Sequence, residues 1–469
     1  MDAFQNEAGR DNDSLLRASL TEQTGTGANV TMENSIGDVL VPIFITGGGR
    51  SGSTALMSRV GTDARVAFDR AYPFENRYLT YLVKFALSLE KPELFRYIEV
   101  EHLVNFDYLG FGGAIPGPEA IPAPGPHQIA RPSLEQWVRR MWVEMSCAVK
   151  FQEPDKNFYA EKAPLWVPPI VRRFFPCLTV YNTRDPRDVY LSANAFNKKR
   201  KHFGFGRSAG DSDIDHARNI ALGFLMCYEA YHFDRHRDDA LLIRYEDFVC
   251  RRAQVLGELE DRAGLSLRNE DCCPELEFHR TTGDLASSVR RWEREPLPQG
   301  VSDYLEEHAG EEMEDLGYPL TARRRCSLRR LSFSEGRVNV KSIACSPDGE
   351  LIPERDGCAV QVSGDDFWIL LPCDSFSASD VTQVWVSLDG EIGDVVSLYW
   401  ACDGQSGFAE ERAIHLSYSP LVNRVVLPFR VSRHPDWKGI ISHLRLDLFN
   451  ARKKPHTGKG YLRWVQLAR

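Results

Sequence analysis

A loop near the start of the chain has the composition of an anion-binding site. Three glycines, 47–49, follow the apolar run 41–46, and a helical pattern then extends over 53–60. Glycines let backbone N–H groups come close to a ligand, and the start of a helix adds positive potential. The stretch therefore predicts a strand, a turn and a helix that together cradle an anion.

The spacing of this loop is nearly that of a Walker A motif, G-x-x-x-x-G-K-[S/T], from Gly47 to Thr54. Ser53 stands at the lysine position. In a nucleoside-triphosphate loop that lysine reaches the β- and γ-phosphates, so a loop without it suits a shorter anion. Arg50 instead supplies a permanent, fork-shaped cation. The alternatives are an ordinary glycine turn and a degraded nucleotide kinase.

A second stretch repeats this organisation at a later strand. The apolar run 177–182 leads into a loop that carries Arg184, and Pro186 opens a helix over 186–199 that contains Ser192. Ligands of open parallel sheets bind outside the carboxyl ends of the strands, so the two loops should lie side by side. Arg184 and Ser192 could then grip a separate phosphate, or Arg184 could belong to a surface salt-bridge cluster.

Short apolar runs alternate with longer helical patterns up to residue 322, which predicts an α/β domain with a doubly wound parallel sheet over 39–322. A polar stretch, 1–38, precedes it and is predicted to be disordered. The Pro- and Gly-rich stretch 110–132 predicts an irregular loop. The remaining predicted strands are 65–69 and 241–245, and the remaining predicted helices are 72–89, 133–150, 167–175, 213–237 and 247–263.

Beyond a basic linker, 323–334, the helical period disappears. Alternating apolar runs separated by turn residues predict an antiparallel β-sandwich over 335–469. Its predicted strands are 338–343, 381–386, 396–400, 425–429, 444–449 and 461–467. Five tryptophans fall in this part, and most of them should be core residues: Trp368, Trp385, Trp400, Trp437 and Trp464.

Composition excludes several classes of protein. The net charge of −9 argues against a general nucleic-acid binder, and no apolar run is long enough to span a bilayer. The 11 cysteines are scattered without a C-x-x-C pair, so neither a zinc site nor a disulfide framework is indicated. The N-terminal stretch lacks the pattern of a secretion signal, and a cytoplasmic location is expected. The oligomeric state cannot be inferred.

The two anion motifs, in this order, resemble those of the sulfotransferases that use 3′-phosphoadenosine 5′-phosphosulfate (PAPS). Residues 49–54 look like the family's 5′-phosphosulfate loop, and 184–192 look like its 3′-phosphate motif. Residues 161–164 resemble the family's E-K-T-P segment, with alanine in place of threonine. Residues 243–248 resemble its RYEDL strand end, and 287–294 its late serine–arginine–tryptophan loop. The likeness covers about 40–320 and leaves out the β-rich end.

This resemblance implies transfer of a sulfuryl group from PAPS to a hydroxyl, without a metal. It implies ten donor-binding residues: Gly49, Arg50, Ser51, Gly52, Ser53, Thr54, Arg184, Ser192, Arg291 and Trp292. A donor with a 3′-phosphate and a 5′-phosphosulfate needs two anion pockets at adjacent strand ends. Arg50, the loop amides and Lys162 would stabilise the leaving phosphate.

The general base that deprotonates the acceptor has three candidates. Glu75 is expected early in the helix 72–89, where several relatives of the family place a catalytic glutamate; the alternative is a first-turn glutamate stabilised by the helix dipole. Glu161 is the second candidate, with an ion pair to an arginine as its alternative role. His202 is the third, although its basic run, 198–202, reads more simply as a solvated helix end that could steer an anion.

The acceptor is expected to be a glycan or glycolipid. The segments 441–447 and 465–467 faintly resemble the ends of sandwich domains attached to bacterial glycan-processing enzymes. Two other functions stay open at this point: a P-loop-type nucleotide kinase, and a non-catalytic glycan-binding protein with a relic nucleotide fold.

Overall fold

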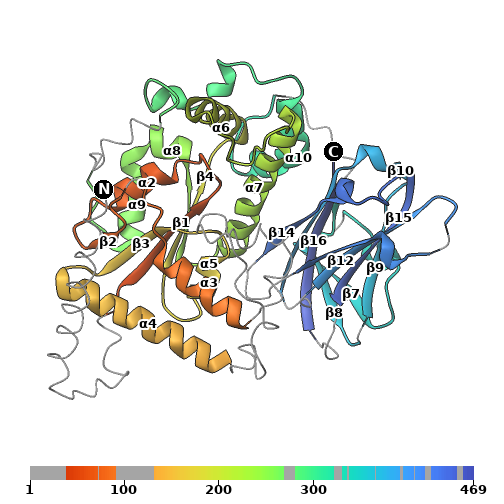
Figure 1. Ribbon diagram of the computed structural model, residues 1–469, viewed down its shortest axis with the longest axis horizontal. Coiled ribbons are helices and arrows are strands. Elements are labelled where there is room, and N and C mark those ends of the chain that lie inside the picture. Colours follow the sequence, from red (N-terminus) through yellow and green to blue (C-terminus); the bar gives the residue numbers. More distant parts are fainter. Residues whose placement is uncertain are drawn as a thin grey trace, which may run out of the picture.

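The computed structural model describes residues 39–71, 73–90, 131–268, 280–321, 330–334, 337–364, 366–390, 395–405, 407–417, 424–450 and 458–469. The predicted disordered tail, 1–38, lies outside these residues, as does the predicted loop 110–132 except for its last two residues. Figure 1 shows an α/β domain beside a β-rich domain, as the sequence predicted. No described helix is long and apolar enough to cross a membrane.

The α/β domain is built on five parallel strands in the order β2-β3-β1-β4-β5. The strands are β1 (Val41–Gly47), β2 (Val66–Phe68), β3 (Phe158–Lys162), β4 (Leu178–Thr183) and β5 (Ala240–Arg244). β1 and β4 are neighbours, and Gly47 at the end of β1 pairs with Asn182 near the end of β4. The glycine loop and the Arg184 loop therefore leave the sheet side by side, as expected.

Helices pack against this sheet, and some of them also pack against each other (Figure 1). They are α2 (Ser53–Val60), α3 (Tyr78–Glu90), α4 (Arg131–Gln152), α5 (Val167–Val171), α6 (Pro186–Arg200), α7 (Asp213–Asp234), α8 (Tyr245–Cys250), α9 (Arg252–Ala263) and α10 (Val301–Asp315). Two short 3₁₀ turns, η9 (Ala286–Ser288) and η10 (Arg291–Glu293), lie in the late loop.

Four details differ from the sequence prediction. The predicted helix 167–175 is shorter, because α5 ends at Val171. α3 begins at Tyr78 and not at 72, because Phe74 has a φ of 63°, a left-handed conformation that a right-handed helix cannot contain. The predicted helix 247–263 is two helices, α8 and α9, which are separated at Arg251. The strand β3 and the helix α10 were not predicted.

The β-rich domain consists of two antiparallel sheets. One sheet has the order β14-β11-β16-β8-β7, with β6 also on β16, and the other has the order β10-β15-β12-β13, with β9 also on β15. The strands are β6 (Arg330–Ser332), β7 (Gly349–Glu354), β8 (Gly357–Val362), β9 (Asp366–Leu371), β10 (Phe376–Ser377), β11 (Gln383–Gly390), β12 (Val395–Cys402), β13 (Ala413–Ser417), β14 (Val425–Phe429), β15 (Ile440–Asn450) and β16 (Gly458–Ala468).

Five of the six predicted strands of this domain correspond to β11, β12, β14, β15 and β16, whereas β7, β8, β9, β10 and β13 were not predicted. The predicted strand 338–343 is wrong, because that stretch holds only a short 3₁₀ turn, η11 (Val340–Ser342). Residues of the predicted linker form β6, which pairs with β16. The tryptophans are mostly buried, as expected: Trp385, Trp400, Trp437 and Trp464 are each at most 8% exposed.

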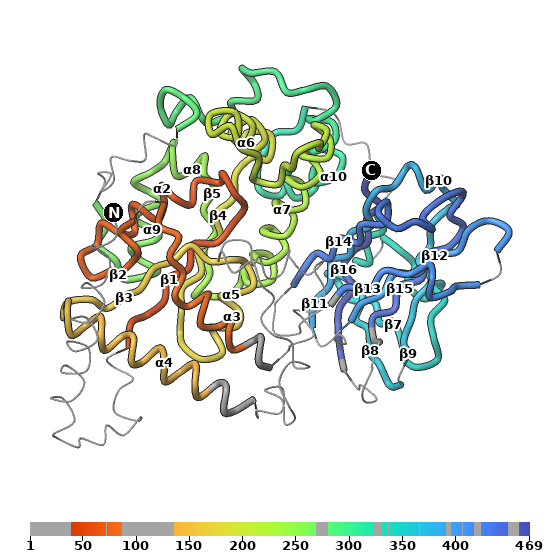
Figure 2. Tube along the Cα trace, viewed as in Figure 1, coloured from red at the N-terminus to blue at the C-terminus, as the bar shows by residue number. Residues whose placement is uncertain are grey.

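One face of the first sheet packs on helices α7 and α10 of the α/β domain, and Figure 2 shows β14 beside α7. Trp385, Val426 and Trp464 share one apolar cluster with these helices. The indole N–H of Trp464 donates to Glu229 on α7, and the hydroxyl of Tyr304 on α10 donates to the carbonyl of Arg469 at 3.2 Å. The two domains therefore share buried core and are not joined only by the linker.

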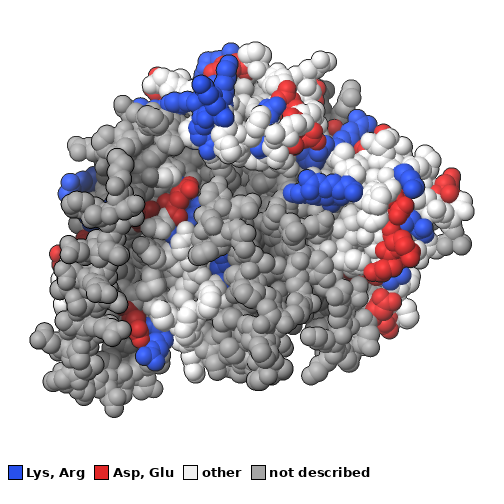
Figure 3. All heavy atoms as spheres, in the orientation of Figure 1, with Lys and Arg blue, Asp and Glu red and all other residues white. Residues whose placement is uncertain are grey.

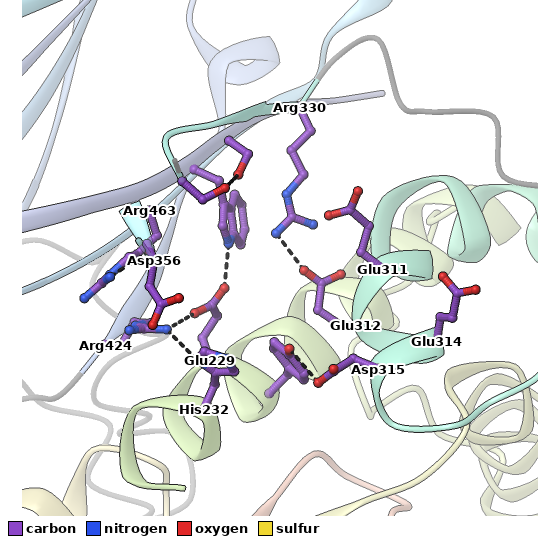
Figure 4. Close-up of a pocket in the computed structure, with 14 residues that line it drawn as sticks. Glu229, His232, Glu311, Glu312, Glu314, Asp315, Arg330, Asp356, Arg424 and Arg463 are labelled. Atoms are coloured by element: carbon purple, nitrogen blue, oxygen red, sulfur yellow. Dashed lines mark hydrogen bonds and ion pairs between the residues drawn. The ribbon is translucent and has the colours of Figure 1, made fainter. Parts of the chain in front are cut away.

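Buried charges cross this junction (Figure 4). Arg424, which precedes β14, pairs with Glu229 at 3.2 Å and with Asp389 at 3.0 Å. Arg330 of β6 pairs with Glu312 of α10 at 2.6 Å. Arg424, Glu229, Arg330 and Glu312 line a polar cavity of about 450 Å³ between the domains. A buried ion pair is costly to break, because the partner that stays behind is a buried, uncompensated charge.

We therefore expect Arg424→Met to lower the free energy of unfolding by about 3–5 kcal/mol, measured by urea denaturation. Lys438→Met is the matched control, because Lys438 forms an ion pair with Asp436 in which the two side chains are 75% and 42% exposed. Such an exposed pair contributes about 0–1 kcal/mol. Equal, small losses in both variants would show that the junction charges are solvated.

Candidate functional site

The glycine loop packs closely against the side chains of Tyr245 and Phe205. Gly52, at the start of α2, has a φ of 97°, and a Cβ atom there would lie 2.3 Å from Cδ2 of Tyr245. A Cβ atom on Gly49 would lie 2.7 Å from Cδ1 of Phe205. Only glycine fits these two positions, so the backbone is held where its N–H groups can face a ligand.

Arg50 joins the two predicted anion motifs. Its Nε donates to Oγ of Ser192 at 3.1 Å, and its guanidinium lies 4.3 Å from the centre of the Phe196 ring. The backbone of Arg50 is left-handed, with a φ of 66°. Such a conformation costs a non-glycine residue about 1 kcal/mol or more and is concentrated at functional sites.

Arg184 is buried next to the contact between Arg50 and Ser192. It connects this contact with two further segments, which contain Tyr245 and Ser288. It donates to the carbonyl of Arg50 at 3.3 Å and to the carbonyl of Ser288 at 2.6 Å. Its guanidinium lies 4.5 Å from the centre of the Tyr245 ring, and the hydroxyl of Tyr245 hydrogen-bonds to that of Ser288 at 2.8 Å. Tyr245 and Ser288 lie in the later motifs, but no sequence pattern assigned a role to either residue.

Several polar groups here are left for a ligand. Oγ of Ser51 and Nε of Arg184 are buried and have no hydrogen-bond partner among the described residues. Gly52, the N-cap of α2, has no side chain to cap the helix. Because a buried donor without an acceptor costs about 1–3 kcal/mol, these groups fit the oxygen atoms of a bound anion. The site therefore suits an anionic ligand.

A second cluster lies beside the start of α2. Nζ of Lys162, at the end of β3, donates to Glu75 at 2.9 Å and to Oγ1 of Thr54 at 3.2 Å. Burial lowers the pKa of Lys162, and the carboxylate of Glu75 opposes this shift. The Glu75 side chain is 38% exposed, so solvent reaches its carboxylate. The structure thus brings Glu75, Lys162 and the start of α2, directly after the glycine loop, together.

Glu75 does not lie in a helix. It precedes α3 by three residues, so the expected position in a first helical turn is wrong, and so is stabilisation by the dipole of that turn as its alternative role. The displacement follows from the late start of α3.

Glu161 is 1% exposed and is occupied by the start of α3. One carboxylate oxygen accepts from the N–H of Leu79, and the other accepts from the N–H and the hydroxyl of Thr80, at 3.1, 3.1 and 2.6 Å. The hydroxyl of Tyr159 also donates to it at 2.9 Å. Glu161 is therefore a helix cap, and the ion pair with an arginine suggested as its alternative role is replaced by these four hydrogen bonds.

Two of the expected donor-binding residues have other partners. Arg291 forms a bidentate pair with Glu295, with both distances 2.7 Å. The ring of Trp292 lies 3.6 Å from the guanidinium of Arg187. In this loop it is Ser288 that reaches Arg184, as described above.

His202 is exposed just beyond α6 and lines a cavity of about 430 Å³ with Lys198, Lys201 and Arg207. Figure 3 shows Lys and Arg gathered on the surface over α6. This position agrees with the expected solvated, basic helix end.

Burial raises the pKa of two carboxyl groups beside Arg184 above the ordinary range. Burial raises the pKa of Asp188 to about 6, although the guanidinium of Arg184 opposes the shift. Burial likewise raises the pKa of Glu246 to about 7, and the hydrogen bond from the N–H of Asp185 opposes this shift.

Among the described residues, no group of three or more His, Cys, Asp or Glu side chains could hold a metal ion.

Comparison with known proteins gives distant likenesses. No protein-family model and no curated protein matches the chain. The sulfotransferase domain from the curacin biosynthetic pathway is 16% identical, with a TM-score of 0.34, over 60% of this chain and 99% of that one. The sulfotransferase domain of the Synechococcus PCC 7002 olefin synthase is 19% identical, with a TM-score of 0.32, over 60% and 96%.

The xylan-binding module CBM86 from Roseburia intestinalis is 13% identical, with a TM-score of 0.21, over 27% of this chain and 89% of that one. With identities and TM-scores this low, none of these likenesses decides the function, which we infer below from the geometry of the site.

The raised pKa of Glu246 makes a testable contribution to stability. The folded-state pKa of Glu246, about 7, exceeds the ordinary value of 4.5, so the folded protein favours the protonated carboxyl. The stability of the fold that depends on this group is therefore fully present below about pH 4.5 and is lost as the pH rises through 7. We expect the wild-type protein to lose on the order of 2 kcal/mol more stability than Glu246→Gln between pH 4.5 and 8, measured by denaturant titration. Glu144→Gln, at a side chain that is 58% exposed, is the control that should keep the wild-type profile. Parallel profiles for wild type and Glu246→Gln would contradict the assignment.

Proposed function

We propose that this chain is a PAPS-dependent sulfotransferase that transfers a sulfuryl group to a hydroxyl of a glycan or glycolipid. The observation that carries the proposal is the 3.1 Å contact between Arg50 and Ser192, which joins two anion-binding motifs at adjacent strand ends. A donor that carries anions on both its 5′ and 3′ positions needs this arrangement, whereas a nucleoside triphosphate needs a lysine where Ser53 stands.

The described residues divide between the two ends of the donor. The backbone of 49–54, with Arg50 and the unpaired hydroxyl of Ser51, would hold the 5′-phosphosulfate. Arg184 and Ser192 would hold the 3′-phosphate, with Tyr245 and Ser288 fixing the guanidinium of Arg184 from behind. Rigid, prearranged hydrogen-bond donors of this kind stabilise the negative charge that develops on a leaving phosphate.

The acceptor side is assigned to Glu75 and Lys162. In the proposed reaction the acceptor oxygen bonds to sulfur, the bond from sulfur to the 5′-phosphate oxygen breaks, and Glu75 takes the acceptor proton. 3′,5′-ADP leaves. Lys162 contacts both Glu75 and Thr54, so it can balance charge between the base and the leaving phosphate. The β-sandwich docked beside this domain is the feature that favours a carbohydrate acceptor.

Arg184→Ala should weaken the binding of 3′,5′-ADP by about 1.5–3 kcal/mol, the range for a hydrogen bond to a charged group. The binding of AMP, which lacks the 3′-phosphate, should change little. Titration calorimetry with both nucleotides measures the difference, and a thermal melt shows whether the variant is folded. Equal losses for the two nucleotides would mean that Arg184 does not read the 3′-phosphate.

Glu75→Gln keeps the size of the side chain and removes its basicity. Turnover with labelled PAPS and an acceptor should fall about 10²–10⁴-fold, the usual contribution of general-base catalysis, while the affinity for 3′,5′-ADP should hold. Glu153→Gln, at an exposed glutamate of the same domain, is the matched control and should keep full turnover. An active Glu75→Gln enzyme would remove Glu75 from the mechanism.

A further inference from the structure

The start of α3 is attached to β3 through its backbone N–H groups. A helix leaves its first N–H groups without intrahelical acceptors. Here the N–H of Tyr78 donates to the hydroxyl of Tyr159 at 3.2 Å, and those of Leu79 and Thr80 donate to the two oxygens of Glu161, both at 3.1 Å. Side chains of a single strand therefore satisfy three consecutive donors, and a carboxylate at this end is also favoured by the helix dipole.

Glu161 and Lys162 are adjacent on β3, so their side chains leave opposite faces of the strand. Glu161 holds α3 at Leu79 and Thr80, and Lys162 holds Glu75 at 2.9 Å. The segment 75–80 is thus fixed to one strand at both ends. A shift of α3 along β3 would carry Glu75 away from Lys162.

We infer that Glu161 is a positioning residue. It keeps the carboxylate of Glu75 beside the amine of Lys162, and so in place to reach the acceptor hydroxyl. It cannot act as the base itself, because it is 1% exposed and both of its oxygens already accept hydrogen bonds. Its influence on the reaction must therefore pass through α3 to Glu75. Only the kinetic part of this inference rests on the proposed function. The attachment of Glu75 to Lys162 can be measured without turnover.

The kinetic test is a double-mutant cycle between Glu161→Gln and Glu75→Gln. Glutamine has one acceptor oxygen where Glu161 uses two, so α3 loses part of its attachment. Glu161→Gln should lower kcat about 10²-fold, as expected for a catalytic group displaced by about 1 Å, with unchanged affinity for 3′,5′-ADP. In the Glu75→Gln background it should lower kcat no further, because the two residues act as one unit.

Chemical labelling tests the same point without relying on sulfotransferase activity. The rate at which acetic anhydride modifies Lys162, followed by mass spectrometry, should rise in Glu161→Gln and in Glu75→Gln, because both lose the ion pair that shields the amine. Asp234→Asn is a control for general loss of stability: Asp234 is buried and binds Arg172 and Tyr181, and its variant should leave the labelling of Lys162 unchanged.

The possible outcomes separate the inference from the proposed function. If Glu161→Gln leaves both kcat and labelling at wild-type values, or lowers kcat equally in both backgrounds, the positioning role is overturned. If Glu75→Gln is fully active, the base assignment fails, and labelling alone then decides whether Glu161 positions Glu75. Should Glu161→Gln not fold, Thr80→Ala and Tyr159→Phe each remove one hydrogen bond to Glu161 and should show the same pattern with smaller changes.

Discussion

The hydrogen bond from Arg50 to Ser192 is the contact on which the arrangement of the site depends. It connects the turn after β1 with the helix after β4, two segments that are 142 residues apart in the sequence. Arg50 reaches Ser192 only because its backbone is left-handed and because the neighbouring glycines let the loop pack against Phe205 and Tyr245. The cost of that conformation is offset by the ring of Phe196 under the guanidinium. A single charged side chain thus connects the glycine loop with α6.

Strand β3 gives the site its second half. Its last two residues point in opposite directions, so that one buries a carboxylate under α3 and the other presents an amine to Glu75 and Thr54. The buried carboxylate of Glu161 is tolerated because four hydrogen bonds replace the water that it lost, even though burial raises its pKa. The carboxylate of Glu75 is instead partly exposed and paired with Lys162. Two glutamates that are both plausible bases in the sequence therefore have different environments.

The β-sandwich is part of the same folded unit and is not a tethered accessory. The sheet face that carries Trp385 and Trp464 is covered by α7 and α10. Along β11, the residues that would face water in an isolated sandwich are instead buried, including Ser387 and Asp389. A buried charge at such a face is tolerated when it is paired, and Asp389 is paired with Arg424 and Arg463. The part of this face that α7 and α10 cover is therefore closed to a ligand of the sandwich.

The sequence by itself determined the elements whose signals are local. The apolar run, glycines and helix of 41–60 fold as predicted because each is encoded by its own neighbours, and the same holds for the Arg184 loop and for five of the six strands that were predicted in the sandwich. β3 could not be predicted in this way, because it is short and ends in two charged residues.

The tertiary structure alone decided which side chains meet. The sequence could not show that Glu161 would cap a helix at Leu79, 82 residues earlier in the chain, because no periodicity links the two segments. In the same way, packing of the late loop placed Ser288 on Arg184 and turned Arg291 and Trp292 toward Glu295 and Arg187. Local patterns fix where a strand or a helix forms, whereas contacts between distant side chains depend on how those elements pack.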